Sequence, residues 1–413
     1  MRFSDNGRCG RSQVPVFRWK VFYRPLSGEI MKVVQIGCGA VGLVTARHLM
    51  KSEKIDELVL ADISTDKAAG LVKELKAEKK TTVKKADASD RAGLKKLFKG
   101  ADLVINGTIP RFNENVMRAC LDAGTNYIDF AMGDEFDQFS LDDEFRDEGL
   151  GALISMGEDP GITDVMAMSA SKKLDEVDKI FVRDGDNASV PGYKYVALFS
   201  PDTLIDETLC KPLIYRDGKW DRLEPFSGEE DYEFPAPIGK LKTYFCDHEE
   251  PALMPRYIKT NYCDFKIALD PDFVRFTKML HELGLTSSKP VEIKGCKVAP
   301  RDVVTYFMPK PADLAGKVKG YGCVLVELHG KKAEKRKRIK MWTLMSHEDA
   351  YKLSGMHATG YLVGTPGAVA AIMWADGKIK EKGVFPPEKL DSEEFLARLQ
   401  QYSITIGQSI EDL

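Results

Sequence analysis

The stretch that decides the fold is Met31–Gly42, MKVVQIGCGAVG. Residues 32–36 alternate like a β-strand, and the residues that follow the last glycine have helical spacing. Of the glycines between them, Gly37 permits a tight turn, Gly39 lets backbone N–H groups approach a pyrophosphate, and Gly42 allows the helix to pack closely on the strand. The helix N-terminus then faces the anion. We therefore predict a dinucleotide-binding loop; the alternative is a glycine turn that only packs a βαβ unit.

A second expected strand, Glu57–Ala61, is followed by Asp62. This acid lies about twenty residues beyond the last glycine, where a carboxylate can accept hydrogen bonds from ribose hydroxyls and would repel an additional phosphate. We therefore expect NAD as the cofactor, with NADP as the second choice. The expected cofactor contacts are Gly37, Cys38, Gly39, Ala40, Val41, Gly42, Asp62, Ile63, Asp87, Ala88, Gly107, Thr108, Ile109, Pro110, Pro160 and Gly161.

Strands and helices continue to alternate after Asp62. This alternation predicts an α/β fold with a doubly wound (Rossmann) parallel sheet and right-handed crossovers. Ligands of such sheets bind beyond the carboxyl ends of the strands, so the loops that follow strands carry the chemistry. The expected elements are helices over 65–77, 91–98, 113–123 and 164–173 and strands over 102–106, 126–130 and 152–156, with another strand leading to Asp87.

Near Asp178 the pattern changes to that of hairpins. Asp217-Gly218 is a short turn signal, and Cys323–Leu328 can pair with Ile339–Leu344 across a basic tip. These patterns predict a second α+β domain with a largely antiparallel sheet. From Ser346 helical spacing returns with many glycines and alanines, which indicates a helix very close to another backbone.

We expect four parts: a basic extension over 1–30, an NAD(P)-binding Rossmann domain over 31–160, a substrate and dimerisation domain over 161–345, and a C-terminal helical segment over 346–413 that returns to the Rossmann domain. The basic extension shows no hydrophobic periodicity and no apolar core of a secretory signal. It is either a targeting arm or a segment upstream of a natural start at Met31. We favour the second, because the predicted fold begins immediately at Met31.

Composition narrows the expected partners. The 413 residues are 43% hydrophobic and 30% charged, and the net charge of −3 gives no reason to expect nucleic acid or an anionic membrane as partner. No apolar run approaches the roughly twenty residues that a membrane span needs. The eight cysteines show no metal-ligand spacing, so we expect no metal and a reducing cytoplasm. The basic tract over 331–338 is interpreted as a solvated hairpin tip, with a nucleic-acid contact as the alternative.

Carboxylates occupy two of the predicted strand ends. Glu158 and Asp159 precede Pro160 and Gly161, which force a sharp turn and expose the acids at the ligand edge of the sheet. For Asp159 the alternative is a helix N-cap. Asp129 ends a strand at the same edge, where it serves either beside the nicotinamide or as a structural hydrogen-bond acceptor.

A third candidate is His248, within Cys246–Glu250, CDHEE. A histidine beside two acids can shuttle a proton or bind an amine, because its pKa moves easily across neutrality. A merely solvated loop is the alternative. His347 belongs to a segment with capping-box chemistry, and His357 is expected to be a packed core histidine.

Taken together, these residues resemble the saccharopine dehydrogenase-like family, which includes saccharopine dehydrogenase, lysine 6-dehydrogenase and carboxynorspermidine dehydrogenase. The resemblance covers most of residues 31–406. The earlier segments IGCGAVG, LVINGTIPRFNENVMRACLDAGTNYIDFA and MGEDPGIT are similar to family segments in the same order, and FNE at 112–114 is similar to the lysine 6-dehydrogenases. The later segments CDHEE, PVEIKGCKVAPRDVV, SHEDAY, TGYLVGTPGAVA and KGVFPPE look more like the carboxynorspermidine branch.

The resemblance implies reversible hydride transfer between a nicotinamide and a carbon that bears an amine. We expect an NAD(P)-dependent dehydrogenase of a lysine-type or saccharopine-type amine; the alternatives are a carboxynorspermidine-type polyamine dehydrogenase and a non-catalytic dinucleotide sensor. The expected catalytic residues are Asp129, Asp159 and His248, and the expected substrate-binding residues are Arg111, Glu158, Lys194, Glu249 and Arg256. We expect a homodimer, because an exposed antiparallel sheet often pairs with a second copy.

Overall fold

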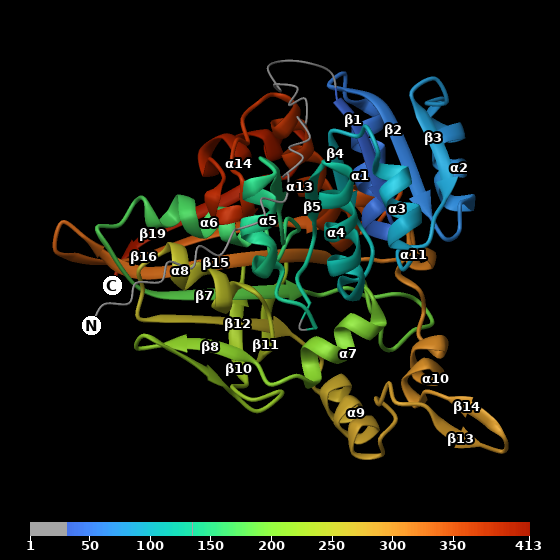
Figure 1. The fold of residues 1–413 in the computed structure, drawn as a ribbon. Coiled ribbons are helices and arrows are strands. Elements are labelled where there is room, and N and C mark those ends of the chain that lie inside the picture. Colours follow the sequence, from blue (N-terminus) through green and yellow to red (C-terminus); the bar gives the residue numbers. More distant parts are fainter. Residues whose placement is uncertain (1–30, 134) are drawn as a thin grey trace, which may run out of the picture.

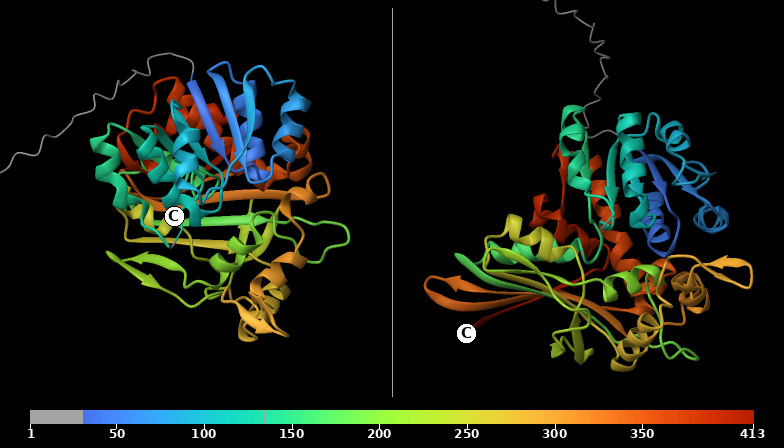
Figure 2. Two further views of the ribbon diagram at one scale, coloured as in Figure 1. Left: turned by 45° about the vertical axis from the view of Figure 1, so that its right-hand side comes forward. Right: turned by 60° about the horizontal axis from the view of Figure 1, so that its bottom comes forward.

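The computed structural model describes residues 31–133 and 135–413; the extension expected over 1–30 lies outside the described residues. Two β-sheets lie in layers, a parallel sheet with its helices above a wide mixed sheet (Figures 1 and 2). Both predicted sheet types are therefore confirmed. Among the described residues, no helix combines the length and the apolar character that crossing a bilayer requires.

The first sheet has seven strands in the order β18-β6-β5-β4-β1-β2-β3, all of them parallel. Its strands are β1 (Met31–Ile36), β2 (Ile55–Asp62), β3 (Thr81–Lys85), β4 (Leu103–Asn106), β5 (Asn126–Asp129), β6 (Gly151–Leu153) and β18 (Gly383–Phe385). The helices between them are α1 (Ala40–Lys51), α2 (Asp66–Leu75), α3 (Arg91–Phe98), α4 (Asn113–Ala123) and α5 (Asp142–Asp147). Both faces of the central strands are covered, so β4 and β5 are fully buried runs, as parallel strands usually are.

Strand β18 was not expected from the sequence. It pairs in parallel with β6, although the two strands are far apart in the chain. It is only three residues long and lacks a periodic pattern, so only its partner identifies it as a strand. The C-terminal part of the chain thus completes the first sheet.

The second sheet has ten strands, with the main order β10-β11-β12-β7-β15-β16-β19. Of its pairs, only β12 with β7 is parallel. Both expected hairpins form: β8 and β9 flank Asp217-Gly218, and in the other Leu328 pairs with Ile339. The strands are β7 (Glu176–Asp186), β8 (Leu213–Arg216), β9 (Lys219–Arg222), β10 (Glu230–Phe234), β11 (Gly239–Phe245), β12 (Tyr262–Ala268), β15 (Tyr321–Lys332), β16 (Lys335–Thr343), β17 (Met345–Ser346) and β19 (Ile406–Asp412).

The remaining helices cover the second sheet or join it to the first. They are α6 (Ile162–Ser171), α7 (Pro201–Leu209), α8 (Glu250–Tyr257), α9 (Pro271–Glu282), α10 (Pro300–Phe307), α11 (Pro311–Leu314), α12 (His347–Ser354), α13 (Ala358–Ala375) and α14 (Ser392–Gln401). Three short 3-10 helices are η1 (Pro110–Phe112), η2 (Gln138–Leu141) and η3 (Pro387–Lys389). Helices α9 and α10, with the small hairpin β13 (Val291–Ile293) and β14 (Cys296–Val298), form a lobe at the lower right of Figure 1.

Helix α13 packs against α1, as its small residues predict. A Cβ atom at Gly364 would lie 2.6 Å from the carbonyl oxygen of Val41, so a larger side chain does not fit there. The Thr45 hydroxyl donates to the carbonyl of Gly364 at 2.8 Å. His357 at the start of α13 is fully buried and accepts a hydrogen bond from the Gly360 backbone N–H at 3.3 Å, as expected of a core histidine.

Candidate active site

The glycine loop joins β1 to α1, and its glycines have different surroundings. Gly37 has φ +92°, and a Cβ there would lie 2.4 Å from the carbonyl oxygen of Gly107. A Cβ at Gly42 would lie 2.1 Å from the carbonyl oxygen of Gly37. At Gly39, by contrast, a Cβ would meet no atom of the described chain within 4 Å. The loop is thus packed by protein at two glycines and open at the one where backbone must approach a pyrophosphate.

Asp62 is fixed against this loop at the end of β2. Its Oδ2 accepts a hydrogen bond from the Cys38 N–H at 2.6 Å, and its Oδ1 accepts one from the Ser64 N–H at 2.8 Å. This geometry suits a carboxylate that receives ribose hydroxyls beside the glycine loop. Burial, with the Asp62 charge, raises the pKa of Cys38 to about 12, so its thiol stays neutral.

A cavity of about 660 Å³ lies where the glycine loop faces the second sheet. From the first sheet it is lined by the expected cofactor residues Gly39, Ala40, Val41, Gly42, Gly107, Thr108, Ile109 and Pro110. The other expected cofactor residues, Gly37, Cys38, Asp62, Ile63, Asp87, Ala88, Pro160 and Gly161, do not line it. Asp62 ends β2 and Ile63 follows it, while Asp87 and Ala88 follow β3, so all four lie at the carboxyl edge of the parallel sheet.

Carboxyl groups from three segments meet at this cavity. Glu158 and Asp159 come from the loop before α6, Asp184 and Asp186 from the end of β7, and Glu207 from α7. Burial and then mutual repulsion raise the pKa of Glu158, Asp159 and Asp184. Burial also raises the pKa of Glu207 to about 8. So many acids in one enclosed space create a strong preference for a cation.

His248 lines the same cavity, and its ring is held from two sides. Its Nδ1 lies 2.5 Å from Oε2 of Glu250, and the ring stacks on Phe265 with centroids 3.8 Å apart. Burial acts to lower the pKa of His248, but Glu250, together with Glu249 and Glu207, outweighs it and holds that pKa well above its ordinary value. These carboxylates therefore favour the protonated form of His248. In the described part of the chain no hydrogen bond engages its Nε2, which leaves this atom available to a ligand.

The histidine and its two acids lie close enough together to be considered as metal ligands, but two of them bond to each other in this structure. Candidate ligand atoms of His248, Glu249 and Glu250 lie within 4.8 Å of one another. A cation held about 2.0–2.2 Å from each ligand needs ligand atoms roughly 3 Å apart. The 2.5 Å contact between His248 and Glu250 is shorter than that and is a charge-assisted hydrogen bond.

Asp129 is placed differently from the other two catalytic candidates. It is 1% exposed and does not line the cavity. Its carboxylate accepts hydrogen bonds from Tyr127 Oη at 2.7 Å, Gln138 Nε2 at 2.6 Å and the Ser155 N–H at 2.7 Å. Burial raises the pKa of Asp129 to about 7, while the three hydrogen bonds act in the opposite direction. The geometry matches the structural alternative considered for this residue.

Of the candidate substrate-binding residues, some line the cavity and others do not. Glu158 and Lys194 line the cavity, and the Lys194 ammonium lies 3.0 Å from Asp272. Glu249 accepts a hydrogen bond from the Met132 N–H at 2.8 Å, behind His248. The guanidinium groups of Arg111 and Arg256 do not line the cavity: the first lies over Phe112, and the second lies over Phe139 and Trp220.

Five charged residues at the cavity were not predicted from the sequence: Asp184, Asp186, Glu207, Asp270 and Lys310. Asp184 and Asp186 stand at alternate positions at the end of a mostly buried strand, so both point to one face. That spacing is a signal the sequence offered. Glu207 lies within α7 and Lys310 immediately precedes α11, and neither carries a local signal, because each is a single charged residue outside any motif.

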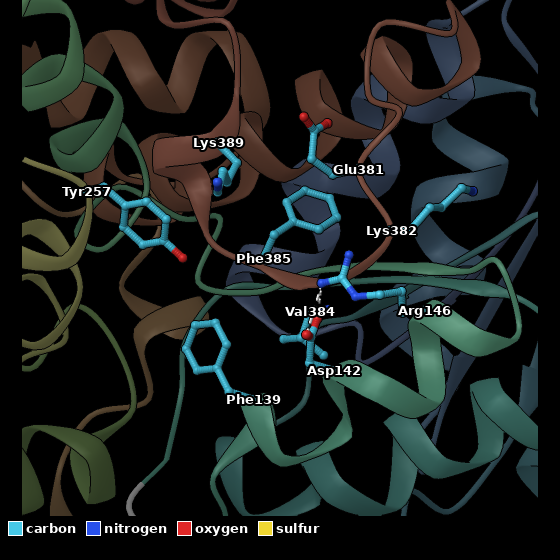
Figure 3. Close-up of a pocket in the computed structure, with 9 residues that line it drawn as sticks. All are labelled: Phe139, Asp142, Arg146, Tyr257, Glu381, Lys382, Val384, Phe385 and Lys389. Carbon is cyan, nitrogen blue, oxygen red and sulfur yellow. Dashed lines mark hydrogen bonds and ion pairs between the residues drawn. The ribbon is translucent and has the colours of Figure 1, made fainter.

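A second pocket, of about 510 Å³, lies away from the glycine loop (Figure 3). Phe139, Tyr257 and Phe385 give it an aromatic side, and Arg146 bonds both oxygens of Asp142 at 2.9 Å. Its other lining residues are Glu381, Lys382, Val384 and Lys389. No glycine of the β1–α1 loop and no acid of the main cavity reaches it.

The basic tract forms the tip of the β15–β16 hairpin. Lys332 pairs with Asp175 at 2.6 Å, Lys337 pairs with Asp412, and Arg338 pairs with Glu411. These pairs partly neutralise the tract, which favours a solvated hairpin over a nucleic-acid contact.

Comparison with known proteins agrees with this fold. Residues 33–153 match the model of the saccharopine dehydrogenase NADP binding domain, and residues 157–404 match that of the saccharopine dehydrogenase C-terminal domain. The chain is 30% identical over 385 residues to a carboxyaminopropylagmatine dehydrogenase of Synechocystis sp., covering 90% of this chain and 96% of the relative. It is 29% identical over 407 residues to a carboxynorspermidine synthase of Vibrio cholerae, covering 93% and 97%.

Two solved structures share the fold. The apo saccharopine dehydrogenase (L-Glu forming) of Saccharomyces cerevisiae has a TM-score of 0.71 at 15% identity, with 92% of this chain and all of that chain covered. The homospermidine synthase of Legionella pneumophila in complex with NAD has a TM-score of 0.67 at 16% identity, covering 93% and 92%. The fold and the glycine loop define a nicotinamide-dependent oxidoreductase. The chain belongs to the saccharopine dehydrogenase family, as its sequence motifs indicated.

Proposed function

We propose that this protein is an NAD(P)-linked dehydrogenase that interconverts a secondary amine and an imine on a polyamine-type substrate carrying a carboxylate. The observation that carries the proposal is the set of five cavity acids beside His248. Among the described residues, the lining of this cavity also includes a further carboxylate, Asp270, and two lysines, Lys194 and Lys310. A substrate with several ammonium groups complements this excess of carboxylates.

This proposal favours the polyamine alternative over the lysine-type amine expected first. Lysine and saccharopine carry at least one carboxylate for every two amines, and a cavity with five acids would repel those groups. The names of the two curated relatives also point to carboxylated polyamines. In the proposed complex, Lys194 or Lys310 receives the single carboxylate, and the acids receive the ammonium groups.

The residues divide the chemistry as follows. A bound nicotinamide supplies or accepts the hydride. His248 exchanges a proton with the reacting nitrogen through Nε2, because an amine must be neutral to attack an aldehyde or to release hydride. Asp159, which lines the same cavity, stabilises the cationic form of that nitrogen. Asp129 holds the loop before α6 through the Ser155 N–H and has no direct role.

We further propose a preference for NAD, because the Asp62 carboxylate lies where an additional ribose phosphate would be. The dinucleotide-sensor alternative requires an apolar or closed space opposite the nicotinamide, whereas the charged cavity favours a catalyst. We also propose a homodimer: β10 and β19 are the outermost strands of the main path of the second sheet, and open edges of this kind can pair with a second copy. Sedimentation velocity tests the dimer.

The experiment follows reduced nicotinamide absorbance with purified protein and three sets of substrates. The first set combines a diamine or agmatine with a short aldehyde that carries a carboxylate; the second and third are lysine and saccharopine with oxidised cofactor. We expect turnover with the first set, lost in His248→Asn. Turnover with only lysine or saccharopine would support the lysine-type or saccharopine-type substrate expected from the sequence. No change in absorbance with any of the three sets would overturn both substrate assignments.

A further inference from the structure

A network of buried hydrogen-bonding side chains leads from His248 away from the cavity. Oε2 of Glu250 meets the histidine at 2.5 Å, and Oε1 of Glu250 accepts a hydrogen bond from the Thr163 hydroxyl at 2.9 Å. The same hydroxyl lies 3.5 Å from Oδ2 of Asp164, which also accepts the Gly161 N–H at 2.7 Å. Glu250, Thr163 and Asp164 are all fully buried.

At its far end, this network reaches two neighbouring carboxyl groups. Asp164 and Glu388 are both buried and lie close enough for each to shift the pKa of the other. Within the described chain, Oδ1 of Asp164 and both carboxyl oxygens of Glu388 have no hydrogen-bond donor. Two ionised carboxylates in contact inside a protein repel strongly, and one shared proton supplies the missing donor.

The charges around the pair agree with a retained proton. Burial, then Glu388 and Glu250, raise the pKa of Asp164 well above its ordinary value. Burial and Glu250 also raise the pKa of Glu388 to about 7, although hydrogen bonding from its own backbone and from Asp164, and the Arg256 guanidinium, act in the opposite direction. On the far side stands Tyr257, which lines the pocket of Figure 3 together with Lys389, the neighbour of Glu388.

We infer that Asp164 and Glu388 share one proton and act, through Thr163 and Glu250, as positioning residues that set the charge of His248. While the pair holds its proton, Asp164 does not compete for the Thr163 hydrogen, which stays on Glu250. Glu250 in turn holds Nδ1 of His248, so that Nε2 faces the cavity. When the pair loses its proton, the additional negative charge makes His248 retain its own proton to higher pH. The shared proton does not depend on the proposed function; only its effect on catalysis rests on the proposed role of His248.

The test uses the full chain and two readouts that need no turnover. The infrared difference spectrum of the wild type minus Glu388→Gln, whose amide donates without titrating, should show the band of one protonated carboxylic acid at neutral pH. The cavity acids are common to both proteins and cancel in the difference. NMR of the His248 ring, assigned by its loss in His248→Asn, should give a titration at higher pH in the wild type than in Glu388→Gln, by on the order of one pH unit.

Thr163 supplies the matched controls. Thr163→Val keeps the buried volume and removes the hydroxyl, so adding Glu388→Gln to it should move the His248 titration by less than it does in the wild type. Thr163→Ser keeps the hydroxyl and should behave as the wild type. Absence of the acid band from the difference between the wild type and Glu388→Gln, or identical His248 titrations in these two proteins, would overturn the inference. If both readouts behave as expected while no amine is turned over, the proposed function fails and the inference stands.

Discussion

Nδ1 of His248 lies 2.5 Å from Oε2 of Glu250, and the Glu250 side chain is fully buried. This contact fixes the orientation of the imidazole and leaves Nε2 toward the cavity. His248→Asn should therefore lower kcat by roughly 10²–10⁴-fold, the usual contribution of a positioned proton donor. Affinity for the dinucleotide, measured by fluorescence titration, should not change. A full rate in His248→Asn would remove the histidine from the mechanism.

The open space at Gly39 makes this residue a specific probe of the cofactor. Because a Cβ there meets no protein atom within 4 Å, Gly39→Asp should fold normally and lose dinucleotide binding through the charge placed against the pyrophosphate. Gly42→Ala is the contrasting variant, since its Cβ would lie 2.1 Å from a carbonyl oxygen and should lower Tm. Unchanged NAD affinity in Gly39→Asp would show that this space does not receive the pyrophosphate.

Asp62 should govern the choice between NAD and NADP. A hydrogen bond to a charged group contributes about 1.5–3 kcal/mol, so Asp62→Ser should weaken NAD by roughly 10- to 150-fold and improve the relative binding of NADP. Asp62→Asn keeps an acceptor for Cys38 and removes only the charge, so it separates repulsion from hydrogen bonding. The measurement is the ratio of the two Kd values; the same ratio in all three proteins would contradict a ribose role.

The cavity acids should couple polyamine binding to pH. The pKa of Glu207 rises from 4.5 to about 8 in the folded protein, so the folded state binds more protons and loses stability as pH rises through this window. A bound polyamine compensates the carboxylates as they ionise. A diamine should therefore raise Tm more at pH 8 than at pH 6, and Glu207→Gln should reduce that difference. An equal thermal shift at both pH values would count against the cavity as an ammonium site.

Asp129 should contribute to the stability of the folded protein and not to the reaction rate. In Asp129→Asn, the side-chain amide would point an N–H donor at Tyr127, Gln138 or Ser155, which are themselves donors to Asp129. A buried donor left without an acceptor lowers the free energy of unfolding by about 1–3 kcal/mol. Asp129→Asn should thus lower the Tm while the folded fraction keeps its kcat. An unchanged Tm with a lost kcat would instead support the catalytic role first considered.

The sequence predicts those parts of the molecule whose signal is local. The glycine loop, the alternation up to β6 and the two hairpins depend on spacing within a few residues, and all of them form. Strand β18 has no such signal, because three residues become a strand only beside β6. The same holds for the cavity. Glu158, Asp159 and His248 stand in recognisable motifs, whereas Glu207 joins them only because the second sheet and α7 bring it there.

The arrangement of β18 also has a consequence for synthesis on the ribosome. The edge of β6 stays without its neighbour until the Gly383–Phe385 segment has emerged, long after the rest of that sheet has been translated. A nascent chain therefore exposes an unpaired parallel edge, to which chaperones or other nascent chains can bind. Shortened chains that stop before this segment should be prone to aggregation even though they contain the entire glycine loop.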